Sequence, residues 1–176
     1  MTMNLPPWNK FSHLLKQLEI PAKTTLLTEG QVSNTAYFII KGCLRLWFNN
    51  NGKDITFQFF FEGDSVSSIE SFETRQPSLF SLESIEPCSL YSITKKDFQF
   101  IIENSPEIRS NLEAQTFNRL LFYQKLFLSR IKDGPEKRYQ ELLEQHPELL
   151  LRVPQHYIAS YLGITSVSLS RIRNRR

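Results

Sequence analysis

Short runs of apolar, aromatic and β-branched residues, each closed by turn residues, follow one another from Lys23 to Ile93. They read TTLLTEG, AYFIIKG, CLRLWF, DITFQFFF, LFSLESI and CSLYSI, and the last two alternate between apolar and polar residues. The Asn51-Gly52 pair between the third and fourth runs suits a turn that needs positive φ. Strands this short and this regularly spaced predict an antiparallel barrel or jelly roll.

Helical patterns lie on both sides of these runs. Apolar residues at helical spacing predict a first helix over residues 8–18, which Pro21 ends. After the last run, Thr94 can cap a short helix over KKDFQFIIEN, and Pro106 opens a long helix that meets no breaker before Gly134. At about 1.5 Å per residue the long helix spans roughly 35–40 Å, which is long for a small globular domain.

Apolar residues on the long helix form two stripes. One stripe consists of Leu112, Leu120, Tyr123 and Phe127, and the other consists of Phe117, Leu121 and Leu128. A helix with two apolar stripes normally packs against two partners. The barrel can be one partner and the same helix of a second subunit the other, as a coiled-coil-like seam. We therefore expect a homodimer held by the first stripe, with a helix buried in a monomer core as the alternative.

The last stretch, VPQHYIASYLGITSVSLSRIRNRR, has the spacing of a helix-turn-helix, with helices over residues 154–161 and 166–173. Ala159 is small where two helices would cross, and Gly163 stands at a turn that requires positive φ. The Thr165 hydroxyl can cap the second helix. A small apolar core is available from Ile158, Leu162, Ile164, Leu169 and Ile172.

Positive charge gathers at this end of the chain. The net charge is only +3, yet no Asp or Glu follows Arg152. A basic end on a near-neutral chain indicates a polyanion-binding module, and a solvated tail is the alternative.

We expect the second helix of this unit to enter the DNA major groove, with its N-terminal residues nearest the base edges. Arg171 can pair with a guanine, and the hydroxyls of Thr165 and Ser168 can hold phosphates. Arg173, Arg175 and Arg176 would add salt-dependent affinity. The candidate DNA-binding residues are Thr165, Ser166, Val167, Ser168, Ser170, Arg171, Arg173, Asn174 and Arg175.

The stretch VPQHYIASYLGITSVSLSRIR resembles the helix-turn-helix of the Crp/Fnr family of transcription regulators. In the barrel, IIKGCLRLW is similar to the family's strand–glycine–strand signature, and EGDSVSSIESF falls where the family carries its phosphate-binding cassette. The resemblance covers nearly the whole chain.

The resemblance implies an α+β fold with three parts. These are an N-terminal double-stranded β-helix (jelly roll) over residues 1–105, a long dimerisation helix over residues 106–132, and a C-terminal winged-helix-like helix-turn-helix over residues 133–176. Because the predicted dimer pairs two such helices about a two-fold axis, we expect its double-stranded DNA target to be an inverted repeat. RNA polymerase is a further candidate partner.

The cassette departs from the cyclic-nucleotide pattern of that family. Members that bind cyclic AMP have a Gly-Glu-Leu turn and then an Arg-Ser pair, in which Glu holds the ribose and Arg neutralises the phosphate. Here these positions read Ser67-Ser68-Ile69 and Pro77-Ser78, and Arg75 lies earlier in the chain. A phosphate buried without its guanidinium is costly. We therefore expect an unknown small-molecule effector other than cyclic AMP, or none, at a degenerate cassette of Gly63, Ser67, Ser68, Ile69, Arg75, Pro77 and Ser78.

Other classes of function find little support. Cys43 and Cys88 lie far apart and outside any C-x-x-C pair, so we expect no metal site and no cofactor. No Ser/His/Asp arrangement, P-loop or HExxH motif occurs, so we expect no catalytic residues and no enzyme activity. Because no signal-like N-terminus and no apolar run of about 18 residues is present, we expect a cytoplasmic protein without membrane contact. The open alternative is a cyclic-nucleotide-like sensor module that regulates a protein partner without DNA binding.

Overall fold

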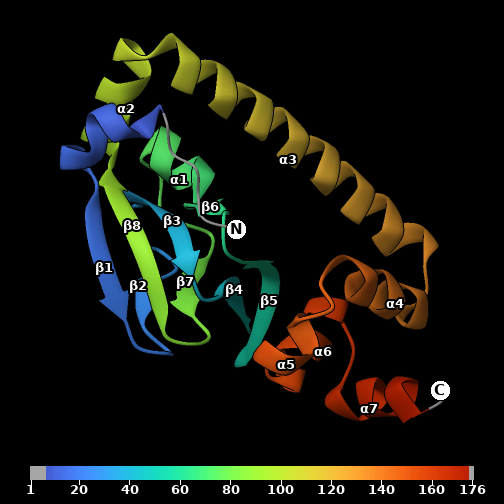
Figure 1. Ribbon diagram of the computed structural model, residues 1–176. Coiled ribbons are helices and arrows are strands. Elements are labelled where there is room, and N and C mark those ends of the chain that lie inside the picture. The colour runs from blue at the N-terminus through green and yellow to red at the C-terminus, as the bar shows by residue number, and fades with distance from the viewer. Residues whose placement is uncertain (1–6, 175–176) are drawn as a thin grey trace. The chain divides into compact units, whose positions relative to one another are not determined.

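The computed structural model describes residues 7–174 of the chain (Figure 1). The chain divides into two compact units between Ser110 and Asn111. Helix α3 (Pro106–Lys132) therefore begins in the first unit and continues in the second. The three-part functional division remains a prediction.

Eight strands form the body of the first unit. They are β1 (Lys16–Ile20), β2 (Thr25–Leu27), β3 (Thr35–Lys41), β4 (Leu44–Asn50), β5 (Lys53–Phe60), β6 (Ser65–Val66), β7 (Ser81–Ser84) and β8 (Cys88–Thr94). They make two four-stranded antiparallel sheets with the orders β1-β8-β3-β6 and β2-β7-β4-β5. The unit also contains the short helices η1 (Trp8–Leu14), α1 (Ile69–Thr74) and α2 (Lys95–Asn104). The predicted jelly roll is confirmed.

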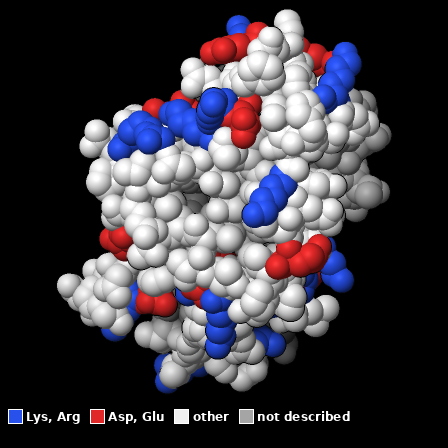
Figure 2. Space-filling model, turned by 90° about the vertical axis from the view of Figure 1, so that its left-hand side faces the viewer, with Lys and Arg blue, Asp and Glu red and all other residues white. Residues whose placement is uncertain are grey.

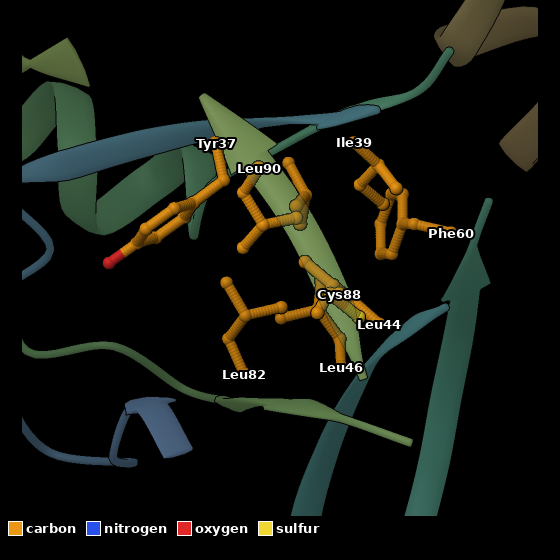
Figure 3. Close-up of a cluster of buried hydrophobic side chains, with 9 residues drawn as sticks. Tyr37, Ile39, Leu44, Leu46, Phe60, Leu82, Cys88 and Leu90 are labelled. Atoms are coloured by element: carbon orange, nitrogen blue, oxygen red, sulfur yellow. The ribbon is translucent and has the colours of Figure 1, made fainter. Parts of the chain in front are cut away.

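The core of this unit lies between the two sheets, where alternate side chains of each strand point inward (Figure 3). Ile39 and Leu90 from one sheet meet Leu44 and Leu82 from the other, and all four are buried. The Tyr37 ring borders this cluster, and its hydroxyl points away from the labelled aliphatic side chains in Figure 3. The core therefore ends in a polar group on one side.

Arg45 stands between two core residues of β4, so it points to the opposite face of the sheet. Its side chain is only 1% exposed, and its guanidinium donates to Glu83 Oε2 at 3.0 Å and to Asp54 Oδ2 at 3.4 Å. It also donates to Thr56 Oγ1 at 3.4 Å and lies over the Trp47 ring. A charge this buried requires a partner, and Glu83 on the neighbouring strand β7 is the more buried of its two carboxylates.

The expected helix over residues 8–18 is wrong in its second half. Helix η1 is a 3-10 helix that ends at Leu14, and β1 begins at Lys16, with Leu18 paired with Leu90 of β8. Leu18 and Ile20 are half-buried, whereas Gln17 and Glu19 are exposed. This alternation fits a strand as well as the apolar spacing fits a helix, and pairing with β8 satisfies the backbone of the segment.

Several local predictions are confirmed. Asn51 and Gly52 have φ of 52° and 83° in the turn between β4 and β5. Thr94 caps α2, because its side chain accepts a hydrogen bond from the Asp97 N–H. Pro106 opens α3, as its missing donor allows.

The second unit contains, after α3, the helices α4 (Pro135–Gln145), α5 (Leu149–Arg152), α6 (Gln155–Leu162) and α7 (Ser166–Asn174). Leu149, Ile158 and Leu169 are fully buried, so these helices share one small core. Within the described part of residues 133–176 there is no strand, and thus no β wing beside the helix-turn-helix. None of the helices described here has both the length and the apolar character to cross a membrane.

The ion pairs of Arg45 lead to a stability prediction. We expect Glu83→Gln to lower the free energy of unfolding by about 3 kcal/mol, because it leaves a buried guanidinium undercompensated. Asp54→Asn is the matched control, and since Asp54 is 45% exposed we expect it to cost less than about 1 kcal/mol. Urea unfolding of both variants measures the difference, and equal costs would contradict this account of Arg45.

Candidate nucleic-acid interface and effector cavity

The turn between α6 and α7 depends on Gly163. Its φ is +69°, a conformation that L side chains rarely adopt. The Gly163 N–H donates to the Ser160 carbonyl and the Ile164 N–H to the Ala159 carbonyl, both at 3.0 Å. These bonds close the end of α6 as in other helices that end on glycine. The predicted helix-turn-helix geometry is thus present.

Two guanidinium groups hold the C-terminal end of α6. Arg130 of α3 donates to the Tyr161 carbonyl and lies 5.3 Å from the centre of the Tyr161 ring. Arg138 of α4 donates to the Leu162 carbonyl at 3.0 Å. Cations are favourable at a helix C-terminus, where carbonyls lack partners within the helix. Burial lowers the pKa of Arg130, Tyr161 raises it and Arg138 lowers it further.

Neither arginine is among the residues that the sequence predicts to have a functional role. In the sequence, Arg130 is only a basic residue in the last turn of the long helix, and Arg138 is only a basic residue near the start of the next helix. Neither signal indicates a carbonyl partner far along the chain.

The first turn of α7 is held by Thr165. Its Oγ1 accepts the Ser168 N–H at 3.1 Å, and the two hydroxyls lie 3.0 Å apart. The Leu169 N–H donates to the Thr165 carbonyl at 3.0 Å, and Leu169 is fully buried. The predicted cap is confirmed, and α7 has one face fastened to its own unit.

The opposite face of α7 is open. Ser166, Val167, Ser170, Arg171 and Asn174 are exposed, whereas Ser168, Ile172 and Arg173 are half-buried. The first group contains the residues expected to project from the helix, and the structure brings them onto one surface. Arg175 and Arg176 lie outside the described residues.

Charge on the face drawn in Figure 2 is mixed. On the face in Figure 2, Lys and Arg lie among Asp and Glu, and most of the surface is uncharged. That face therefore offers no continuous basic field for a nucleic acid.

An apolar face runs along α3 within the second unit. Phe117, Leu120, Leu121, Phe127, Leu128 and Ile131 are all exposed. Their spacing by three, four and seven residues places them on one side of the helix. Leu112 and Tyr123, which the sequence analysis grouped with Leu120 and Phe127, are half-buried. Burial raises the pKa of the Tyr123 phenol.

A cavity of about 180 Å³ opens in the first unit beside the serines of the cassette. Strand β6 pairs with β3 through Val66 and Tyr37, and this pairing carries Ser67 and Ser68 to the cavity wall. The lining residues are all uncharged: Leu26, Leu27, Gln31, Val32, Ser33, Asn34, Thr35, Tyr37, Ser67, Ser68 and Leu82. Burial raises the pKa of Tyr37, while a hydrogen bond with Thr35 lowers it, so the phenol is neutral at physiological pH.

The first unit is similar to a known protein family. A family model for the cyclic nucleotide-binding domain matches residues 17–105, about half of the chain. The chain belongs to the cyclic nucleotide-binding domain family. The Crp/Fnr resemblance of the sequence is confirmed by relatives that include a cAMP-activated global transcriptional regulator CRP from Pasteurella multocida. That protein is 30% identical over 101 residues, which are 57% of this chain and 48% of the relative.

Another curated relative is similar over a stretch of about the same length. The Pycsar effector protein XpPycTIR of Xanthomonas perforans is 29% identical over 103 residues, which are 58% of this chain and 33% of that protein. This chain spans about half the length, or less, of the curated relatives named here.

Two solved structures share the fold over most of the chain. The c-di-GMP responsive global regulator CLP of Xanthomonas campestris superposes with a TM-score of 0.76 at 16% identity, covering 96% of this chain and 89% of that one. FixK2 of Bradyrhizobium japonicum superposes with a TM-score of 0.78 at 18% identity, covering 92% and 83%. The α+β architecture is therefore that of Crp/Fnr-type regulators.

Within this cyclic nucleotide-binding domain the serines of the cassette bond to one another. The Ser78 hydroxyl lies 2.8 Å from that of Ser68 and 2.6 Å from the Phe80 carbonyl. The Ser33 N–H donates to the Ser71 hydroxyl at 2.9 Å. The predicted cassette thus contains a network of hydrogen-bonded hydroxyl groups.

Arg75 stands apart from this network. It is exposed in a left-handed conformation at the end of α1, with φ of 66°, and its guanidinium donates to Asn34 Oδ1. Gly63, Ile69 and Pro77 do not line the cavity either. Of the predicted cassette residues, the structure brings together Ser67, Ser68 and Ser78.

Proposed function

We propose that this protein is a DNA-binding transcription regulator of the Crp/Fnr type, which acts as a homodimer. The exposed polar face of α7 carries this proposal, because the turn at Gly163 and the buried Leu169 hold it rigidly outward. A helix with this placement fits the major groove, where base edges can be read by hydrogen bonds. RNA polymerase is the protein partner that we expect such a regulator to meet on DNA.

Dimerisation would use the exposed apolar face of α3. The predicted contacts are Leu112, Leu120, Tyr123 and Phe127, of which Leu120 and Phe127 lie on that face. Its spacing by three and four residues suits the seam of a two-stranded coiled coil. A two-fold axis would pair the two α7 helices, so the DNA target would be an inverted repeat with half-sites about 34 Å apart.

We expect Leu120→Lys to convert the dimer into a monomer at micromolar concentration, because it buries a charge in the seam. Asn118→Lys is the matched control, since it adds the same charge to an exposed position of α3 outside the apolar face. Analytical ultracentrifugation measures both masses. A wild-type protein that is itself monomeric would contradict the proposed dimer.

Arg171 would carry base readout. Replacing it by Ala should weaken binding to the preferred site by about 1–3 kcal/mol and relax the preference at one base pair. Arg175→Ala is the comparison, and we expect it to weaken all sequences about equally and to reduce the salt slope by about one. Fluorescence anisotropy with specific and random duplexes at several salt concentrations separates the two. An unchanged specificity ratio for Arg171→Ala would make Arg171 a phosphate contact.

A sensor module without DNA binding is the second candidate. It is favoured by the family match, which covers residues 17–105 and does not extend to α6 and α7, and by the similarity to an effector protein. The absence of any salt-dependent DNA binding by the intact protein would favour this candidate over the first.

The cavity beside Ser67 and Ser68 is the proposed effector site, and its uncharged lining suits an uncharged ligand. Cyclic AMP would place a phosphate where no guanidinium lines the wall, at a cost that hydroxyl groups do not offset.

We therefore expect no cyclic AMP binding in isothermal titration calorimetry at millimolar nucleotide. Titration of a DNA duplex into the same preparation is the control that the protein is active. A micromolar dissociation constant for cyclic AMP would overturn the proposed ligand class and leave the DNA-binding proposal standing.

A further inference from the structure

Val167 is an unusual residue for its position on α7. It is 62% exposed in the first turn, whereas the other apolar residues described in this helix, Leu169 and Ile172, are buried and half-buried. Its exposed neighbours Ser166, Ser170 and Arg171 all carry hydrogen-bonding groups. The isopropyl group is thus an apolar point within a polar surface.

The fold gives no reason for a valine here. Val167 does not pack into the core of the unit, and Thr165, not Val167, caps the helix. A β-branched residue is also a weaker helix former than most alternatives. The turn that carries it is held by two hydrogen bonds, in which the Thr165 side chain and carbonyl accept the N–H groups of Ser168 and Leu169.

The chemistry of the side chain limits what it can recognise. An isopropyl group neither donates nor accepts hydrogen bonds, so it cannot distinguish donor from acceptor on a base edge. The apolar group in the major groove is the C5-methyl of thymine. Removing that methyl from water against a valine stabilises the complex, since both surfaces are apolar.

We propose that Val167 determines specificity by packing on the C5-methyl of one thymine in each half-site. The proposal rests on the proposed function, in which α7 enters the major groove. Ser166, Ser170 and Arg171 would contact bases through hydrogen-bonding groups. Val167 would add an apolar contact that distinguishes thymine by its methyl group. Burying a methyl-sized surface corresponds to an effect of roughly three- to fivefold on the dissociation constant.

The test begins with a duplex selected from a random pool by the wild-type protein. Each thymine is then replaced singly by deoxyuridine, which removes the methyl and keeps every hydrogen-bonding group. We expect one position in each half-site to weaken wild-type binding roughly three- to fivefold, and Val167→Ser to lose that dependence. Val167→Ile, which keeps an apolar group, should retain it.

The outcomes separate this proposal from the proposed function. The wild-type protein could bind DNA tightly and selectively but show no deoxyuridine effect, or Val167→Ser could show the same effect as the wild type. Either result would overturn only the role of Val167. Failure to select or bind any DNA would overturn both. Ser166→Ala is the control, and it should leave the deoxyuridine effect unchanged.

Discussion

The register of the barrel strands is the constraint on which the first unit depends. A shift of one residue along β4 would turn Leu44 and Leu46 out of the core and place the Arg45 guanidinium inside it. In the observed register Arg45 lies opposite Glu83 on β7, so the buried charge meets its carboxylate. The pairing of Tyr37 with Val66 similarly decides that Ser67 and Ser68 reach the cavity. The apolar core, the buried ion pair and the cavity beside Ser67 and Ser68 therefore follow from one set of backbone pairings.

The second unit depends on a different kind of interaction. Local capping by Thr165 forms the first turn of α7, but the direction in which the helix points is set by the end of α6. Arg130 and Arg138 bring two cations from separate helices to the last carbonyls of α6. Helix α7 is thus supported through electrostatic contacts of α3 and α4 with the end of α6 as well as through the small core of the unit.

Family membership and chemistry give different information about the effector. The cyclic nucleotide-binding domain family accounts for the barrel, yet the wall of the cavity carries hydroxyl and amide groups in place of charges. A fold supports many sites, and the ligand class follows from the residues that line a site rather than from the fold. This is why the proposed ligand is uncharged although curated relatives are named for cyclic AMP.

The sequence by itself determined the features that depend on neighbouring residues. The Asn51-Gly52 turn, the Thr94 and Thr165 caps, the opening of α3 at Pro106 and the Gly163 turn were all predictable, because each rests on backbone geometry or a bond within a few residues. The open face of α7 was also predictable, since helical periodicity alone separates it from Leu169.

Tertiary structure decided the features that depend on distant partners. Residues 16–20 became a strand because β8 was available to pair with them, although their apolar spacing also fitted a helix. The hydrogen bond between Ser68 and Ser78 and the contacts of Arg130 and Arg138 could not be predicted from the chain. In each case the structure is stabilised by a contact between residues that are far apart in the chain and meet only when it folds. The local sequence therefore does not predict the contact.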